Sequence, residues 1–259
     1  MSPENIDYNE EAMRLGAVHA KHQEKSATPE EKEKQLQEML DELFTLDVIR
    51  AGKDVWQNKF HEFDIYTHTQ EFVRHMRETL GEDIDKDMLA AAVLHDVAKP
   101  VVAAPKEKDG SRLFSKEGQP YNTFPEHEHV GEDMVREMDD ELFNKHGLDK
   151  ELVAKLVGAH YIPMKGIRAI RRTTNREEFD SYYEDLLAQL EETGLSREDV
   201  MTMFMADSLA KGKGCTDCDE LFAIREAVLS RKKGSELDAV YEMQKQEYQN
   251  RPDDYGEKE

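Results

Sequence analysis

One apolar stretch that ends in a histidine and an aspartate constrains this chain more than any other feature. It covers residues 88–100, and at helical spacing His95 lies on the same face as Ala91 and Ala92. We expect Pro100 to end this helix, because proline disfavours helical geometry at the residue before it. A half-buried imidazole beside a carboxylate costs free energy unless a partner satisfies both groups, and a metal ion would do so. For this stretch alone, a charged histidine at a helix end beside a solvated aspartate is the alternative.

Helical periodicity recurs along the chain, whereas strand signals are nearly absent. The first clear helix start is Thr28, a hydroxyl at the N-cap that is followed by Pro29 and two acids. Further helices are expected at about residues 66–80, 85–98, 126–139, 149–160, 164–173, 177–192, 197–210, 219–231 and 235–248. Residues 100–125 are too rich in proline and glycine for a helix and too long for a simple connection, so we expect them to carry function or to move. The predicted fold class is all-α.

The charge of the chain argues against several classes of partner. The chain has 259 residues, of which 36% are charged, and its formal net charge is −22. An acidic balance of this size repels the phosphate backbone, which makes duplex DNA and anionic membranes poor partners. A small phosphorylated substrate that enters a locally positive pocket is still compatible with this charge.

Cysteine usage and hydropathy favour a reducing, cytoplasmic setting. We find no secretory signal and no apolar run of membrane-spanning length, and the two cysteines are Cys215 and Cys218. They form a single C-x-x-C pair, whereas a structural zinc site needs four ligands. We therefore expect a loop with two free thiols.

Four other expected helices place a histidine or an aspartate on an apolar face. These inward residues are His68, His127, His160 and Asp207. His129 is expected to point outward. For any one histidine, a core residue bonded to a backbone carbonyl is the more common explanation. An ionised carboxylate is rarely buried without partners, so Asp207 is harder to explain in this way. A shared metal site accounts for all four residues together with the pair at 95–96.

The order of these residues resembles a known family. His68, the pair at 95–96 and Asp207 are similar to the H…HD…D pattern of the HD-domain metal-dependent phosphohydrolases. Residues 124–131 read F-x-x-H-E-x-x-G, which resembles an element in the HD domain of bacterial tRNA nucleotidyltransferases. Residues 52–64 resemble the segment that leads into the first histidine of that group. The chain lacks the glycine–serine and paired-aspartate signature of a nucleotidyltransferase head, so the resemblance does not imply CCA addition.

The resemblance covers about residues 40–210 and implies an HD-domain helical bundle with additional N- and C-terminal helices. We expect residues 1–27 to form a polar arm or a peripheral helix, and residues 28–231 to form the phosphohydrolase domain. Residues 232–259 are expected to form a C-terminal helix and an acidic tail.

The resemblance also implies a metal site. One divalent ion would be held by the residues of the family pattern, which are His68, His95, Asp96 and Asp207. By similarity to two-metal members, His127 and His160 would serve a second ion, with Asp96 as the bridge. Imidazole and carboxylate ligands suit Mn, Fe, Co, Ni or Zn, Mg is also compatible, and one ion or two remains open. Such a metal lowers the pKa of bound water and makes hydroxide available to attack phosphorus.

Asp96 and Lys99 are the expected catalytic residues, with Lys99 in contact with a substrate phosphate. The alternative for Lys99 is a favourable charge at a helix end. Residues 165–176 contain basic residues and no acid, in a chain that is otherwise strongly acidic. The candidates there to bind a phosphate, a nucleotide or an RNA end are Lys165, Arg168, Arg171 and Arg172. A solvated helix face that pairs with neighbouring acids explains the same run.

The sequence therefore favours a phosphohydrolase that cleaves a phosphomonoester or a phosphodiester, including a cyclic phosphate, of a nucleotide or an RNA end. A non-catalytic HD module that senses a nucleotide or binds a partner is the alternative from another class. An HD oxygenase with a di-iron centre would use similar ligands. Metal-dependent phosphate release, nucleotide binding without turnover, and oxygen consumption distinguish the three.

Overall fold

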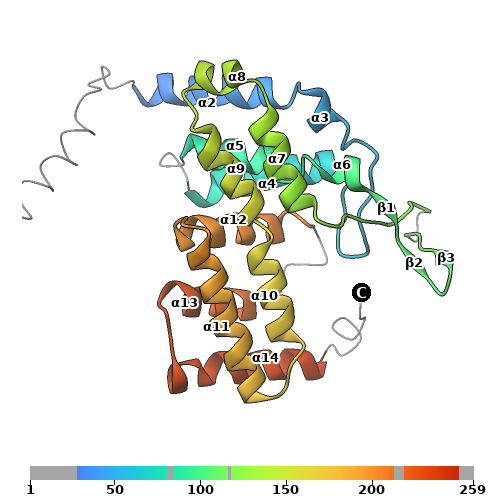
Figure 1. The fold of residues 1–259 in the computed structure, drawn as a ribbon, viewed down its shortest axis with the longest axis vertical. Helices are drawn as coiled ribbons and strands as arrows, with labels where there is room; N and C mark the ends of the chain where they lie inside the picture. Colours follow the sequence, from blue (N-terminus) through green and yellow to red (C-terminus); the bar gives the residue numbers. More distant parts are fainter. Residues whose placement is uncertain (1–27, 81–84, 116–117, 213–218, 251–259) are drawn as a thin grey trace, which may run out of the picture.

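The computed structural model describes residues 28–80, 85–115, 118–212 and 219–250, and helices dominate them, which confirms the all-α class (Figure 1). The first part contains the helices α2 (Pro29–Leu43), α3 (Asp47–Arg50), α4 (Ile65–Leu80), α5 (Lys86–Leu94), α6 (Lys99–Val102), α7 (His127–Glu137) and α8 (Asp140–His146). The second part contains α9 (Lys150–Ala159), α10 (Ile162–Arg171), α11 (Arg176–Glu192), α12 (Arg197–Leu209), α13 (Asp219–Leu229), the 3₁₀ helix η2 (Gly234–Leu237) and α14 (Asp238–Asn250). Among the described helices, none is long and apolar enough to cross a membrane.

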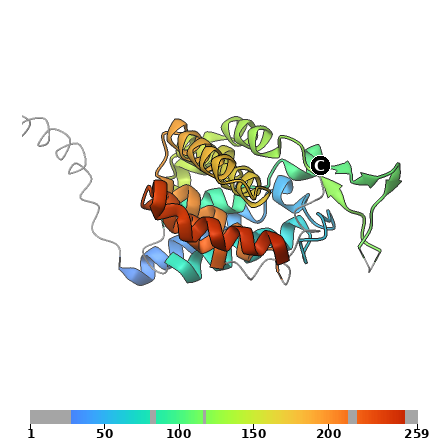
Figure 2. The ribbon, with the colours of Figure 1, turned by 90° about the horizontal axis from the view of Figure 1, so that it is seen from below.

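The segment that was expected to be neither helix nor simple connection forms two short antiparallel strand pairs. The pairs are β1 (Ala104–Pro105) with β4 (Asn122–Thr123), and β2 (Glu107–Lys108) with β3 (Ser111–Arg112). Figure 2 shows this segment projecting from one side of the helical body. Strands of two residues are too short to show an alternating pattern, so the sequence did not reveal them.

The ends of two helices show how the sequence sets local structure. At the start of α2, Glu31 N donates to Thr28 Oγ1 at 3.2 Å, and Thr28 N donates to Glu31 Oε2 at 2.8 Å. This capping box confirms the predicted helix start.

The prediction that Pro100 ends the apolar helix was wrong. α5 already ends at Leu94, and Pro100 lies in the first turn of α6, where a missing N–H leaves no intrahelical bond unmade.

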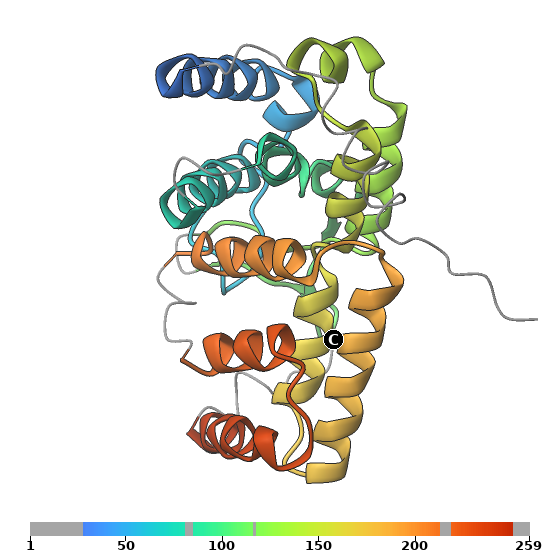
Figure 3. The ribbon, with the colours of Figure 1, turned by 90° about the vertical axis from the view of Figure 1, so that its left-hand side faces the viewer.

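α5 is the central helix, buried along residues 87–94 and packed against α2, α4 and α9. Figure 3 shows α2, then α4 and α5, then α12, α13 and α14 down one side, while α9, α10 and α11 run along the other. One hydrophobic cluster surrounds α5, and a second joins α10 and α11 to α13 and α14. α12 supplies Met203 to the first cluster and Phe204 to the second, so it ties the two together.

Parts of the expected domain division lie outside the described residues. These are residues 1–27 and 251–259, as well as the loop that contains Cys215 and Cys218. Within the described part, α14 packs against α13 and α10. The division into an arm, a phosphohydrolase domain and a C-terminal segment therefore stays a prediction.

A close approach between α10 and α11 yields a test of the packing. A Cβ added at Gly166 would lie 2.8 Å from Leu186 Cδ1 and 3.0 Å from Leu186 Cβ. Alanine favours a helix over glycine by about 1 kcal/mol, but this clash should outweigh that gain. We expect Gly166→Ala to lower the free energy of unfolding by about 1–3 kcal/mol in urea denaturation. Leu186→Ala destabilises the core by itself, but the additional loss caused by Gly166→Ala should be smaller in a Leu186→Ala background, because Leu186 Cδ1 is then absent. A Gly166→Ala protein more stable than the parent would contradict the close approach.

Candidate metal centre

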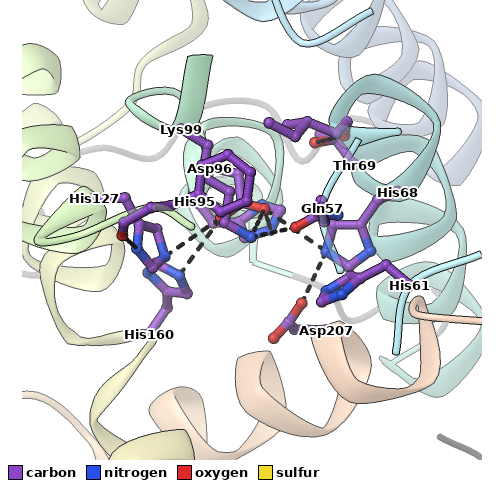
Figure 4. A network of polar contacts seen from close by, with 12 residues as sticks. Gln57, His61, His68, Thr69, His95, Asp96, Lys99, His127, His160 and Asp207 are labelled. Carbon is purple, nitrogen blue, oxygen red and sulfur yellow. Dashed lines mark hydrogen bonds and ion pairs between the residues drawn. The ribbon is translucent and has the colours of Figure 1, made fainter. Parts of the chain in front are cut away.

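Asp96, which follows α5, is the centre of a buried polar cluster (Figure 4). Its side chain is 1% exposed. Its Oδ2 lies 3.0 Å from Nε2 of His95 and 3.8 Å from Nε2 of His68. Its Oδ1 lies 3.6 Å from Nε2 of His127 and 3.8 Å from Nε2 of His160. A single carboxylate therefore faces a different pair of imidazoles with each of its oxygens.

The side chains of this cluster come from helices that are far apart in the sequence. His68 lies on α4, His127 begins α7, His160 follows α9, and Asp207 lies on α12. Asp207 Oδ1 approaches His68 Nε2 to 2.9 Å. The packing of these helices around α5 thus brings all six predicted ligands together.

The six side chains form two groups of three. Within each group, the three potential ligand atoms all lie within 4.8 Å of one another. The groups are His68, His95 and Asp207, and Asp96, His127 and His160. The side chain of His129 is 62% exposed and lies outside them, as helical spacing predicted.

Backbone carbonyls orient all four histidines. Nδ1 lies 3.1 Å from Ala210 O in His68, 2.8 Å from Ala92 O in His95, 2.9 Å from Phe124 O in His127, and 2.5 Å from Val157 O in His160. Because a carbonyl oxygen can only accept, each Nδ1 is the donor, so that a ring in its neutral form presents the lone pair of Nε2 to the cluster. A hydrogen bond of this kind, from the ring nitrogen that faces away from the metal, is typical of histidines that bind metals.

The unsatisfied atoms of the cluster fit a cation. Both oxygens of Asp96, and Nε2 of His68, His95 and His127, are buried and have no hydrogen-bond partner. The short contact between His68 and Asp207 lacks hydrogen-bond geometry. Apart from the ammonium of Lys99, which lies 2.7 Å from Asp96 Oδ2, acceptors thus face acceptors. Each group left unpaired costs about 1–3 kcal/mol. One or two divalent metals that take nitrogen and oxygen ligands would satisfy all of them.

The pKa values favour the protonation states that metal binding requires. Burial lowers the pKa of His160 to about 3, and the charges of His127 and His95 act in the same direction. Burial and the charge of Lys99 also lower the pKa of His127. Burial alone would raise the pKa of Asp96, but His95 and Lys99 outweigh it and hold that pKa well below its ordinary value. Neutral imidazoles and an ionised carboxylate are the forms that bind metal.

Lys99, which was predicted to contact substrate, lies directly on Asp96. Its Nζ is 2.7 Å from Asp96 Oδ2 and donates to Gln57 Oε1 at 2.6 Å. The sequence interpretation missed Gln57, as well as His61, whose ring lies 5.4 Å from that of His68. It also missed Lys211, whose Nζ is 3.7 Å from Asp207 Oδ2. Only Lys211 carries a periodic signal, because it follows Asp207 by one helical turn.

The structure does not bring the whole basic run to this cluster. Lys165 pairs with the buried Glu128, the neighbour of His127. Arg171 instead binds Glu220 through two contacts, of 2.7 and 3.0 Å, and so joins α10 to α13. Arg168 lies on α10 and Arg172 at its C-terminal cap, and α10 leads from the cluster toward α14 (Figure 1). A substrate role for these residues stays a prediction.

The lowered pKa of His160 predicts a loss of stability in acid. Between its ordinary pKa of 6.5 and its folded value of about 3, the unfolded chain binds more protons than the folded chain. The free energy of unfolding of the metal-free protein should therefore fall as the pH drops from about 7 to about 5. His160→Gln should flatten this dependence in thermal denaturation, whereas His129→Gln, at an exposed histidine, should not. Equal pH dependence in the His160→Gln protein and the parent would contradict a neutral, buried His160.

Comparison with known proteins agrees with this geometry. A family model described as HD domain matches residues 65–210, which is more than half of the chain. An A-adding tRNA nucleotidyltransferase from Deinococcus radiodurans is 30% identical over 120 residues, which cover 46% of this chain and 25% of that protein. The similarity thus spans a quarter of that relative's length. No solved structure matches the chain significantly. The matched residues include the whole six-residue cluster, and the chain belongs to the HD-domain family.

Proposed function

We propose that this protein is a metal-dependent phosphohydrolase that cleaves a phosphomonoester or a phosphodiester, including a cyclic phosphate, of a nucleotide or an RNA end. The observation that carries the proposal is Asp96, whose two buried oxygens have no hydrogen-bond partner and each face a pair of imidazoles. Membership of the HD-domain family supports metal-dependent phosphohydrolase chemistry in general. The similarity to a tRNA nucleotidyltransferase supports a nucleotide or RNA ligand.

The two ligand groups suggest how one or two ions would be held. Asp96 would be shared between His68, His95 and Asp207 on one side and His127 and His160 on the other. The donors suit Mn, Fe, Co, Ni, Zn or Mg. When bound, a divalent cation acidifies water and offsets negative charge on a phosphoryl oxygen.

The side chains around the centre would position the substrate. In the proposed reaction, an oxygen of water bonds to phosphorus while the bond from phosphorus to the leaving oxygen breaks. The ammonium of Lys99 would bind a phosphoryl oxygen through a charge-assisted hydrogen bond. Gln57 Oε1 holds that ammonium in place at 2.6 Å. The imidazoles are already fixed by their carbonyl bonds, so the centre needs little rearrangement before the reaction.

Removal of the metal or of Asp96 should abolish phosphate release. We expect the purified protein to contain a divalent metal by elemental analysis, and to hydrolyse p-nitrophenyl phosphate or a 2′,3′-cyclic nucleotide. EDTA should stop the reaction and added Mn²⁺ should restore it. Asp96→Asn keeps the shape of the side chain but removes its charge, and should lower the rate about 100-fold or more.

The control is His129→Gln, which alters an exposed histidine outside both ligand groups and should keep the parent rate. Full activity in EDTA together with full activity in Asp96→Asn would refute the proposal. Oxygen consumption by an iron-loaded protein that releases no phosphate would indicate the oxygenase instead.

A further inference from the structure

A second buried lysine lies at the centre, on the other ligand group from Lys99. Lys211 Nζ is 3.7 Å from Asp207 Oδ2, whereas Lys99 Nζ is 2.7 Å from Asp96 Oδ2. Each of the two ligand groups therefore has an ammonium of its own beside its carboxylate. Lys211 lies outside the family pattern that identified the other residues of the centre.

Two hydrogen bonds to backbone carbonyls fix the position of the main chain at Lys211. The carbonyl of Ala210 accepts from Nδ1 of His68 at 3.1 Å. The carbonyl of Lys211 accepts from the backbone N–H of Glu62 at 2.9 Å. The end of α12 is thus joined both to α4 and to the loop before it, so the ammonium of Lys211 starts from a constrained backbone.

The two lysines and Asp207 are less deeply buried than the other side chains of the centre. The side chains of Lys99, Lys211 and Asp207 are 10%, 8% and 11% exposed. The side chains of His68 and Asp96 are 0% and 1% exposed. Solvent therefore reaches the centre to a greater extent at Lys99, Lys211 and Asp207 than at His68 or Asp96.

Gln57 adds an unused hydrogen-bond donor at the same place. Its Oε1 accepts from Lys99 Nζ, while its Nε2 is buried without a hydrogen-bond partner. Figure 4 shows the side chain of Gln57 reaching toward Lys99 and Asp96. A buried amide N–H of this kind costs free energy unless an acceptor, such as a phosphoryl oxygen, satisfies it.

Charge then selects the kind of anion. In the centre, the carboxylates of Asp96 and Asp207 are balanced by the ammoniums of Lys99 and Lys211, and ligating imidazoles are neutral. A single bound divalent cation whose water ligand is still neutral therefore adds an excess of two positive charges in a buried place, where uncompensated charge is costly. A terminal phosphomonoester supplies two negative charges, whereas a cyclic phosphate or another diester supplies one.

We propose that Lys99, Lys211 and the amide of Gln57 form a subsite for a dianionic phosphoryl group, so that the substrate carries a terminal phosphate rather than a cyclic phosphate or a diester. This inference rests on the proposed function and narrows its substrate class. It assigns Lys211 and Gln57 to substrate binding and leaves metal binding to the six-residue cluster.

Calorimetric titration tests the subsite without a turnover assay. Mn²⁺ is titrated first, and inorganic phosphate or dimethyl phosphate is then titrated into the loaded protein at about pH 8, where phosphate is a dianion. We expect phosphate to bind at least about tenfold more tightly than dimethyl phosphate. Lys211→Met and Gln57→Leu should each weaken phosphate binding about tenfold while Mn²⁺ affinity persists. Lys211→Arg should recover most of the loss.

Lys34→Met is the matched control, because it removes the same charge from an exposed position on α2 and should change neither affinity. A parent protein that binds no Mn²⁺ overturns the proposed function and this inference with it. A parent that binds Mn²⁺ but holds both anions equally well overturns the subsite alone. The same holds if Lys211→Met and Gln57→Leu keep the parent phosphate affinity. Equal affinities of the parent protein for the two anions would overturn the subsite even where a variant does not fold.

Discussion

A carboxylate enclosed by four imidazoles sets the conditions that the rest of the structure meets. Burying an ionised group costs several kcal/mol unless opposite charge and hydrogen bonds compensate for it. Lys99 supplies part of that compensation. A cation held between Asp96, its neighbour His95 and the rings presented by α4, α7 and the end of α9 would supply the rest. Each of those helices must therefore reach the same point, which fixes how they pack around α5. The polar centre and the apolar core thus constrain one another.

The early end of α5 makes this enclosure feasible. Successive residues of a continuous helix point about 100° apart, so two neighbours cannot both face one centre. Because regular helix stops at Leu94, His95 lies at the helix cap and Asp96 in the turn that follows. Both side chains then enter the cluster. Pro100 contributes by starting α6, which carries Lys99 back toward the same carboxylate.

Sequence reasoning succeeded where one helix face is buried and failed where no periodicity exists. Spacing alone separated the inward His127 from the outward His129, because only one face of α7 meets the core. The short helices α3 and α8 were missed, since one or two turns hold too few residues to define a face. Gln57 and His61 lie in a loop, where no period indicates direction. The end of α5 was misjudged because proline suits both the residue after a helix and the first turn of the next.

α12 connects the C-terminal helices to the candidate metal centre. Its one face joins the core around α5, its other face joins the core of α11, α13 and α14, and it carries Asp207 between them. A ligand that binds only the native arrangement at Asp207 raises the free energy of unfolding of both cores, because its binding requires both of them to be folded. Helices beyond residue 210, outside the matched domain, therefore belong to the same cooperative unit as the centre, although none of the six cluster residues lies on them.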